Sequence, residues 1–310
     1  MQVSITTRAI IEAAVKRGWT ANLIDESLDF FEVITDKNET YYFHNLTSYR
    51  GSGVNGFITK YKNLLYDLVK KNNLASLAPT EIFTDYNQAN EFLKTNKKVV
   101  VKPHDQSHGN GITVNVTTEQ GLHDAVELAQ TFGSTTILQK HVEGDDYRLL
   151  FIGGELAAAA IREPAFVVGD GEHTLTELIG IENTKGDRGQ GYELTKTLIN
   201  TDVAYAYLKE SVAIVPGMGE KVQVVGTANI GQGGVSIDVT DTVSPNIAQE
   251  AKRLVEYLRL DVAGVDYIID ESGTGYLIEI NTAPSFGLHE YPHYGDSRHV
   301  ADTYLDWVTS

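Results

Sequence analysis

The chain contains no cysteine, so neither a disulfide framework nor thiolate chemistry is available to it. It also lacks an apolar run of about 18 residues, the length that a membrane-spanning helix needs. Basic residues are few, because 25 Lys and Arg stand against 42 Asp and Glu, and the net charge is −17. Such a chain has no basic face for the phosphates of a nucleic acid. The first ten residues, MQVSITTRAI, lack the basic-then-apolar order of a signal peptide. We therefore expect a cytoplasmic protein that binds neither nucleic acid nor membrane.

What remains is the composition of an ordinary folded protein, with 42% apolar and 22% charged residues. The 310 residues can bury a substantial core and are enough for two or three subdomains. The simplest consequence of the acidic excess is solubility.

The most informative stretch is residues 262–284, which predicts a β-hairpin with its turn at residues 272–273. A turn centred there sets Asp266 opposite Glu279, with their Cβ atoms roughly 4.5–5.5 Å apart. The two-residue period puts Asn281 on the same face as Glu279. Two carboxylates and an amide oxygen are suited to Mg²⁺ or Mn²⁺, although the same pattern also describes a hairpin with a wet polar face.

The other face of this hairpin is expected to lie against the core. By the same alternation, Val265, Ile278 and Ile280 point away from the carboxylates.

Residues 1–58 predict a small α/β lobe. Thr6 or Thr7 can cap a helix that runs to Val15, and strands are expected over 21–26, 30–35 and 39–45. We find no catalytic signal in this lobe.

Residues 59–138 predict a second unit of helices and strands. Its first helix, over 59–74, is amphipathic, and an apolar strand delivers Lys102 at its end. Asn110-Gly111 is a strong hairpin signal, and the glycines around it offer backbone N–H groups. Taken alone, Lys102 can equally be a surface lysine, and the turn can merely link two strands.

Residues 139–310 begin with three strands joined by tight turns. A polar, glycine-rich segment over 183–196 has no periodicity, so it is either a loop over a site or an ordinary disordered connection. Strands over 221–230 and 235–241 and a helix over 245–260 precede the carboxylate hairpin, and a last helix ends the chain.

The order of these parts resembles the ATP-grasp superfamily, most closely the ligase half of bifunctional glutathione synthetases and the ATP-grasp part of cyanophycin synthetases. The most specific segments are EGDDYRLLFIGGELAAAAIREPAFVVGDGEHT, TANIGQGGVSIDVTD and GVDYIIDESGTGYLIEINTAP. The resemblance implies an α+β ATP-grasp fold. A small N-terminal α/β lobe at 1–58 precedes two α/β subdomains, at 59–138 and 139–310, which grip ATP.

The resemblance also implies roles for individual residues. It assigns nucleotide binding to nine of them. Lys62 and Lys102 match the two phosphate lysines, and Ser107, Gly109 and Gly111 belong to the phosphate-covering loop. Gln139, Lys140 and Val142 fall on the linker that reads adenine, and Asp146 matches the acid that binds the ribose hydroxyls. The metal ligands are Asp266, Glu279 and Asn281. Arg148 and Arg162 match arginines of the phosphate and acyl-substrate region.

Two matches depart from the usual pattern, and a third segment has no fixed role. Many relatives have a glutamate where Gln139 stands, and an arginine where this chain has Val225. Loss of that arginine would change substrate choice or weaken catalysis, and Val225 would leave room for a larger acceptor. The roles of His289, His293 and Arg298 stay open, because a structural role explains them equally well.

The activity implied by the resemblance is ligation of a carboxylate to an amine through an acyl phosphate, with ATP and Mg²⁺ or Mn²⁺. The substrates would be amino acids or small peptides. Two alternatives are a nucleotide-binding regulatory module without turnover and a subunit that works only with a separate enzyme. A homodimer is left open.

Overall fold

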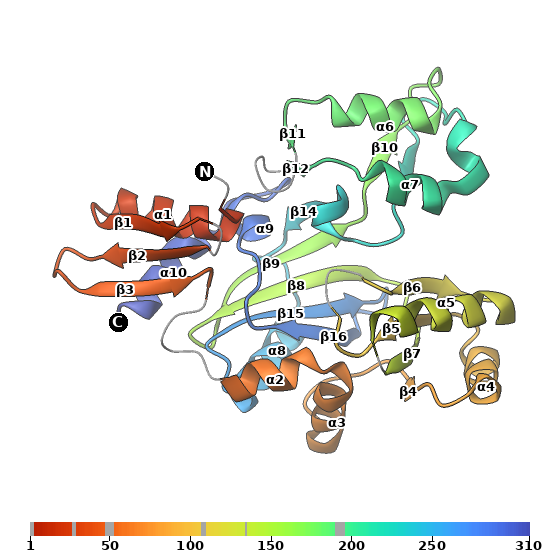
Figure 1. Ribbon diagram of the computed structural model, residues 1–310, viewed down its shortest axis with the longest axis horizontal. Coiled ribbons are helices and arrows are strands. Elements are labelled where there is room, and N and C mark those ends of the chain that lie inside the picture. Colours follow the sequence, from red (N-terminus) through yellow and green to blue (C-terminus); the bar gives the residue numbers. More distant parts are fainter. Residues whose placement is uncertain (1–2, 27–28, 47–52, 107–109, 134, 190–195) are drawn as a thin grey trace.

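The computed structural model describes residues 3–26, 29–46, 53–106, 110–133, 135–189 and 196–310 (Figure 1). A central five-stranded sheet has three further parts arranged around it.

The N-terminal lobe is a three-stranded antiparallel sheet that packs against one helix from near each end of the chain (Figure 1). Its elements are α1 (Ile5–Lys16), β1 (Thr20–Asp25), β2 (Phe30–Ile34), β3 (Thr40–His44) and α10 (Val300–Val308). Phe31 and Tyr304 are buried between the helices and the sheet. Arg17, directly after α1, pairs with Asp302 of α10 at 3.0 Å and with Asp306 at 2.6 Å.

The helix and the three strands predicted for this lobe are present, but the helix begins earlier than expected. Its N-cap is Ser4, whose Oγ accepts a hydrogen bond from the backbone N–H of Thr7 at 3.1 Å. Thr6 and Thr7 therefore lie within the first turn, where both are buried.

The second part is a four-stranded sheet of order β4-β7-β5-β6, packed against α4 and α5. Its elements are β4 (Thr80–Ile82), α4 (Tyr86–Asn96), β5 (Val99–Pro103), β6 (Thr113–Val116), α5 (Glu119–Phe132) and β7 (Thr136–Lys140). The helices α2 (Gly53–Lys60) and α3 (Lys62–Asn72) precede them in the chain, and α3 packs against the central sheet. The predicted strand that carries Lys102 is β5.

The single helix predicted over 59–74 is wrong, because α2 ends at Lys60 and α3 begins at Lys62. Tyr61 between them is extended, with φ −97° and ψ 99°. The backbone N–H of Lys62 donates to the carbonyl of His104 at 2.9 Å instead of continuing the helix. Lys62 is thereby the first residue of α3.

The central sheet has the order β14-β9-β8-β15-β16, with all its neighbours antiparallel. Its elements, with the helices next to them, are β8 (Asp145–Ile152), β9 (Glu155–Glu163), β14 (Val235–Asp238), α8 (Pro245–Tyr257), β15 (Val262–Ile269), β16 (Gly275–Asn281) and α9 (Gly287–Glu290). One face is apolar and packs against α8, with Leu149 and Tyr267 fully buried there. On the opposite face, Leu150 and Ala158 join the core of the N-terminal lobe. The rest of that face carries charged side chains.

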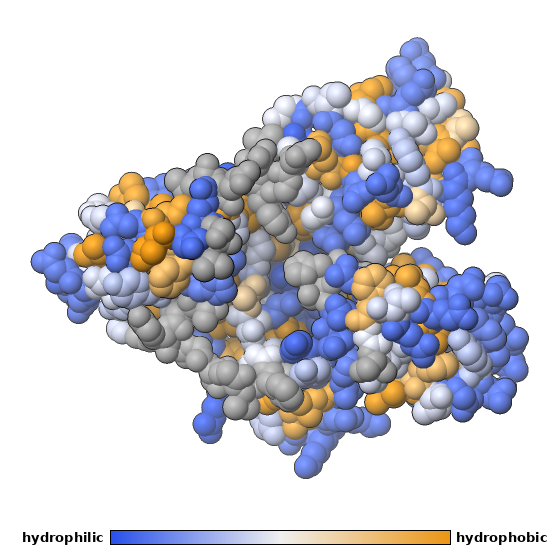
Figure 2. Space-filling view, viewed as in Figure 1, coloured by the Kyte–Doolittle hydropathy of each residue, from blue (hydrophilic) through white to orange (hydrophobic). Residues whose placement is uncertain are grey.

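A third part projects beyond β9 and β14 (Figure 1). Its elements are β10 (Phe166–Val168), α6 (Leu175–Asn183), β11 (Arg188–Gly189), β12 (Lys196–Thr197), α7 (Thr201–Leu208) and β13 (Lys221–Gln223). Figure 2 shows the surface hollowed between this part and the part built on α4 and α5. Of the segment interpreted as a cover over a site, residues 190–195 lie outside the described residues. The guanidinium of Arg188 donates to Glu182 and to the carbonyls of Thr197 and Gly233.

Val225 lies in the apolar core of this third part, together with Ala165, Val167 and Ile179. It is 1% exposed. The expectation that Val225 leaves room for a larger acceptor is therefore wrong, because its side chain faces a packed interior.

The carboxylate hairpin forms, and Asp266 lies opposite Glu279 as predicted. Between this pair and the turn the register shifts by one residue, so that Tyr267 pairs with Leu277. The extra residue is Ile278, which is only partly buried, and Leu277 takes its place in the core. The expected core position of Ile278 is thus wrong, whereas Val265 and Ile280 are buried as predicted.

Among the described residues, no helix is both long and apolar enough to cross a membrane.

Candidate active site

The charged face of the central sheet carries one row of side chains that runs across all five strands. In the strand order β14-β9-β8-β15-β16, the row consists of Asp238, Ala160, Arg148, Asp266 and Glu279. Directly paired residues on antiparallel strands share a face, so these side chains are neighbours. The next row places Arg162 beside Asp146.

Arg148 and Arg162 meet on the carboxylate of Asp266, whose side chain is 2% exposed. Arg148 donates through Nε and, at 2.8 Å, through Nη2. Arg162 Nη2 donates to Asp266 Oδ2 at 2.9 Å and also to Asp146 Oδ1 at 2.5 Å. Burial alone would lower the pKa of Arg162, but the charges of Asp266 and Asp146 raise it above its ordinary value. This forked arrangement fixes the orientation of both guanidinium groups.

Glu279, at the end of the same row, faces Lys62 at the start of α3. Its Oε2 lies 3.4 Å from Lys62 Nζ, and its Oε1 accepts a hydrogen bond from Asn281 Nδ2 at 3.1 Å. Burial would raise the pKa of Glu279, yet Lys62, Asn281 and the two arginines together lower it to about 2. Lys62 also donates to the carbonyl of Gln106 at 2.7 Å, next to the predicted phosphate loop.

Lys102 is buried, like Lys62, and has two polar partners. Its Nζ donates to Gln139 Oε1 at 2.8 Å and to Tyr66 Oη at 3.1 Å. Burial lowers the pKa of Lys102 to about 8, an effect that the charge of Glu279 partly opposes. Lys102 therefore loses its positive charge at a pH only slightly above neutral. Gln139 Nε2 donates to Thr80 Oγ1 at 3.0 Å, so both ends of the Gln139 amide have partners within the protein.

Sequence reasoning missed Tyr66. Its hydroxyl donates to the carbonyl of Ile278 at 2.5 Å and accepts from Lys102. Tyr66 thereby joins α3, the lysine and the carboxylate hairpin. The available signal was its place four residues after Lys62, on the same side of the helix.

The predicted adenine linker borders a cavity of about 210 Å³, lined by Lys140, His141, Val142 and Tyr276 among others. A larger cavity of about 350 Å³ lies along α3 and β4. Tyr66 lines the larger cavity, whereas Lys62, Lys102 and the residues of the charged row do not. The charged row thus lies outside the lining of both cavities.

Two predicted phosphate-loop residues, Ser107 and Gly109, lie outside the described residues. Gly111 is described and has φ +68°. A Cβ at Gly111 would stand 2.9 Å from atoms of both Phe132 and Pro103. A structural requirement thus explains this glycine, whatever its backbone N–H binds.

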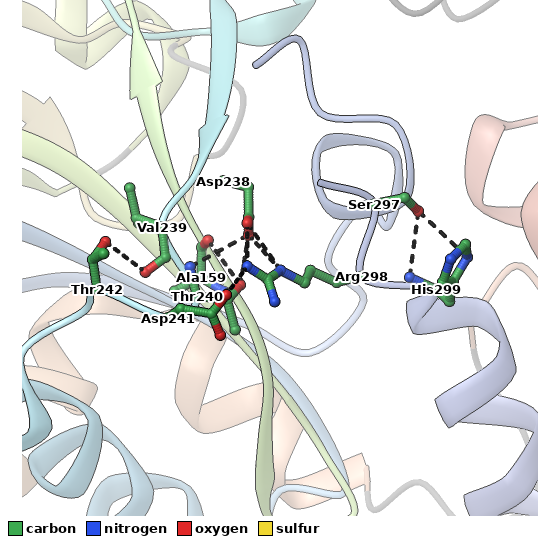
Figure 3. A network of polar contacts seen from close by, with 9 residues as sticks. All are labelled: Ala159, Asp238, Val239, Thr240, Asp241, Thr242, Ser297, Arg298 and His299. Atoms are coloured by element: carbon green, nitrogen blue, oxygen red, sulfur yellow. Dashed lines mark hydrogen bonds and ion pairs between the residues drawn. The ribbon is translucent and has the colours of Figure 1, made fainter. Parts of the chain in front are cut away.

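The far end of the row is closed by the segment after α9 (Figure 3). Arg298 donates through Nε to both oxygens of Asp238 at 2.9 Å, and through Nη2 to Asp241 at 2.7 Å. The backbone N–H of Ser236 donates to the ring of His293 at 2.7 Å. These contacts give Arg298 and His293 structural partners on β14 and directly after it.

His289 is different, because neither ring nitrogen has a hydrogen-bond partner among the described residues. The side chain is 2% exposed. Burial, and then the charges of Arg148 and Arg162, lower the pKa of His289 to about 3, although Asp238 opposes this. The ring is therefore neutral at physiological pH.

Comparison with known proteins shows the family of this chain. The family model described as "Prokaryotic glutathione synthetase, ATP-grasp domain" matches residues 68–169. Cyanophycin synthetase from Crocosphaera subtropica is 34% identical over 222 residues, covering 68% of this chain and 26% of that protein. The glutathione biosynthesis bifunctional protein of Clostridium perfringens is 29% identical, covering 98% of this chain and 41% of that protein.

A solved structure agrees with these sequence matches. The bifunctional glutathione synthetase from Pasteurella multocida superposes with a TM-score of 0.70 at 25% identity, covering 98% of this chain and 43% of that one. The chain belongs to the ATP-grasp superfamily. It spans about a quarter of the cyanophycin synthetase and about two fifths of the bifunctional protein.

Membership of the ATP-grasp superfamily implies the use of ATP and a divalent metal ion. Among the described residues, no group of three or more His, Cys, Asp or Glu side chains is placed to hold a metal. Asp266, Glu279 and Asn281 nevertheless supply three hard oxygen donors, and the first two already attract cationic side chains. The donor set fits a divalent cation that completes its coordination with nucleotide oxygens and water.

Proposed function

We propose that this ATP-grasp chain is an ATP-dependent ligase that joins a carboxylate to an amine through an acyl phosphate. Residues 59–138 and 139–310 would grip the nucleotide between them. The single observation that carries the proposal is the cluster of charged side chains on this face of the sheet. In it Lys62 pairs with Glu279, while Arg148 and Arg162 both pair with Asp266, the residue opposite Glu279.

The nucleotide would lie along the charged row. Lys62 and Lys102 would bind its phosphates, the linker at Gln139, Lys140 and Val142 would border adenine, and Asp146 would bind the ribose hydroxyls. The lysines are buried, so their charges act on the transferring phosphoryl group with little screening by water.

Asp266, Glu279 and Asn281 would hold Mg²⁺. When bound, the metal ion supplies positive charge that offsets the charge of the phosphate oxygens.

The proposed reaction has two steps. A carboxylate oxygen of the donor attacks the γ-phosphorus of ATP, the bond to the β-phosphate oxygen breaks, and ADP leaves. The amine of the acceptor then attacks the acyl carbon, inorganic phosphate leaves, and the amine gives up a proton as the amide forms. Arg148 and Arg162, which present forked donors beside Asp266, would orient the acyl phosphate.

An amino acid or a small peptide is the proposed substrate class. The names of the relatives, glutathione and cyanophycin synthetases, support this choice.

The test is a screen of carboxylate and amine pairs, with ADP release as the readout and mass spectrometry of the product. We expect slow ADP release with ATP and Mg²⁺ alone, and faster release with one amide per ADP when a correct pair is present. If a broad set of amino acids and dipeptides gives no acceleration while calorimetry shows ATP binding, the chain is a nucleotide-binding module instead.

A further inference from the structure

Arg162 bridges two carboxylates through a single nitrogen. Its Nη2 donates to Asp146 Oδ1 at 2.5 Å and to Asp266 Oδ2 at 2.9 Å, and its Nε donates to Asp146 Oδ1 at 3.1 Å. The side chain of Arg162 is 15% exposed, and that of Asp266 is 2% exposed. Because both side chains are largely buried, water competes little for these contacts.

The two carboxylates belong to different halves of the proposed nucleotide site. Asp146 would bind ribose hydroxyls, and Asp266 would bind the metal. Arg162 now occupies one oxygen of each carboxylate, Oδ1 of Asp146 and Oδ2 of Asp266. Because one nitrogen serves both oxygens, movement of the guanidinium away from one carboxylate also weakens its contact with the other.

We propose that Arg162 couples the nucleoside and metal sites, so that either ligand increases the affinity for the other. The first ligand to bind breaks the bridge, and the second then binds a carboxylate that is already released. This coupling rests on the proposed function for the roles of Asp146 and Asp266. It differs from the direct contact of metal with phosphate, because it needs no phosphate at all.

Arg148 is the matched control. It also holds Asp266, with Nη2 at 2.8 Å from Oδ2, but it has no hydrogen bond to Asp146 among those found in the described residues. Removal of Arg148 should release the metal carboxylate while leaving the bridge between the two sites in place.

The experiment measures Mn²⁺ binding to the full chain by electron paramagnetic resonance, with and without saturating adenosine. Adenosine has no phosphate, so it cannot touch the metal directly. In the wild type we expect adenosine to tighten Mn²⁺ binding by about fivefold or more, and Mn²⁺ to tighten adenosine binding by the same factor.

The two variants separate the bridge from simple charge removal. Arg162→Met should bind Mn²⁺ more tightly than the wild type in the absence of adenosine, and adenosine should no longer change that affinity. Arg148→Met should also bind Mn²⁺ more tightly, but should keep the adenosine effect. Circular dichroism and the unfolding midpoint confirm that each variant is folded.

Two results would overturn the coupling. One is independent binding of adenosine and Mn²⁺ in the wild type while ADP with Mn²⁺ still binds, which leaves the proposed function intact. The other is an adenosine effect that survives in Arg162→Met, which assigns the coupling to other residues. If neither adenosine nor ADP with Mn²⁺ binds, the site assignment of the proposed function fails and the coupling fails with it.

Discussion

Asp266 lies directly opposite Glu279, yet the two strands between this pair and the turn are out of step by one residue. The bulge at Ile278 absorbs the difference, and the hydroxyl of Tyr66 binds the carbonyl of that residue. Helix α3 thus contacts the irregular point of the hairpin, directly beside the pair of carboxylates.

Glu279→Gln tests the metal assignment. Glutamine keeps the volume and one acceptor oxygen but removes the charge that would neutralise a metal ion, so we expect turnover to fall by about 100-fold or more. Steady-state ADP release measures the effect. The control is Glu271→Gln on the exposed turn of the same hairpin, which should keep wild-type turnover. Near-normal turnover of the Glu279 variant, with an unchanged metal requirement, would refute the assignment.

Lys102 should make nucleotide binding sensitive to mildly alkaline pH. Its pKa is lowered to about 8, so the cation is lost as the pH rises through 8 rather than near its ordinary value. We expect ADP affinity to fall between pH 7 and 9, and proton uptake on binding at pH 8, measured by calorimetry in buffers of different ionisation enthalpy. Lys102→Met should bind weakly at pH 7 and lose this dependence. A flat profile for the wild type would contradict the prediction.

The position of Lys102 and the pairing of the hairpin carboxylates could be predicted because both follow from local patterns. An apolar run marks β5, and the two-residue period marks which side chains share a face. The break at Tyr61 and the bulge at Ile278 could not be predicted in this way. Each is accompanied by a contact with a residue distant in the sequence, from Lys62 to His104 and from Tyr66 to Ile278.

The role of Val225 shows a second limit. Matching of sequence motifs suggested that this position faces a substrate, but a side chain's direction depends on how its segment packs. Val225 turns into the core beside Ile179. The direction of the Val225 side chain could therefore be known only from the three-dimensional structure, whereas the Asp266–Glu279 pairing could be predicted from the sequence.

His289 should make the fold sensitive to acid. The pKa of His289 is about 3 in the folded chain, so between its ordinary value near 6.5 and 3 the unfolded chain binds a proton that the folded chain does not. Stability is therefore lost as the pH falls through this window, by about 1–2 kcal/mol at pH 5. Urea unfolding at pH 7.5 and pH 5 should show this loss in the wild type.

Substitution separates His289 from the other histidines. His289→Gln should reduce the loss of stability at pH 5, whereas His44→Gln on the exposed side of β3 should leave it unchanged. An equal acid loss in the wild type and in His289→Gln would contradict the assignment.

Arg298 should matter more for stability through Asp238 than through Asp241 (Figure 3). The side chain of Asp238 is 6% exposed, whereas that of Asp241 is 77% exposed. Arg298→Met leaves a buried carboxylate without its cation, and we expect the free energy of unfolding to fall by about 2 kcal/mol. Asp241→Asn should change it by about 0.5 kcal/mol or less. Similar losses for both variants in urea unfolding would show that the exposed contact is equally important.

The ion pairs of Arg17 with Asp302 and Asp306 join α1 to α10 across almost the entire length of the chain. During synthesis, the first helix and the three strands after it leave the ribosome long before their helical partner exists. The part of the apolar surface around Phe31 that α10 covers stays exposed until that partner is made. Closing so long a loop is entropically unfavourable and slow. We therefore expect the N-terminal lobe, although first in the sequence, to become protease-resistant last.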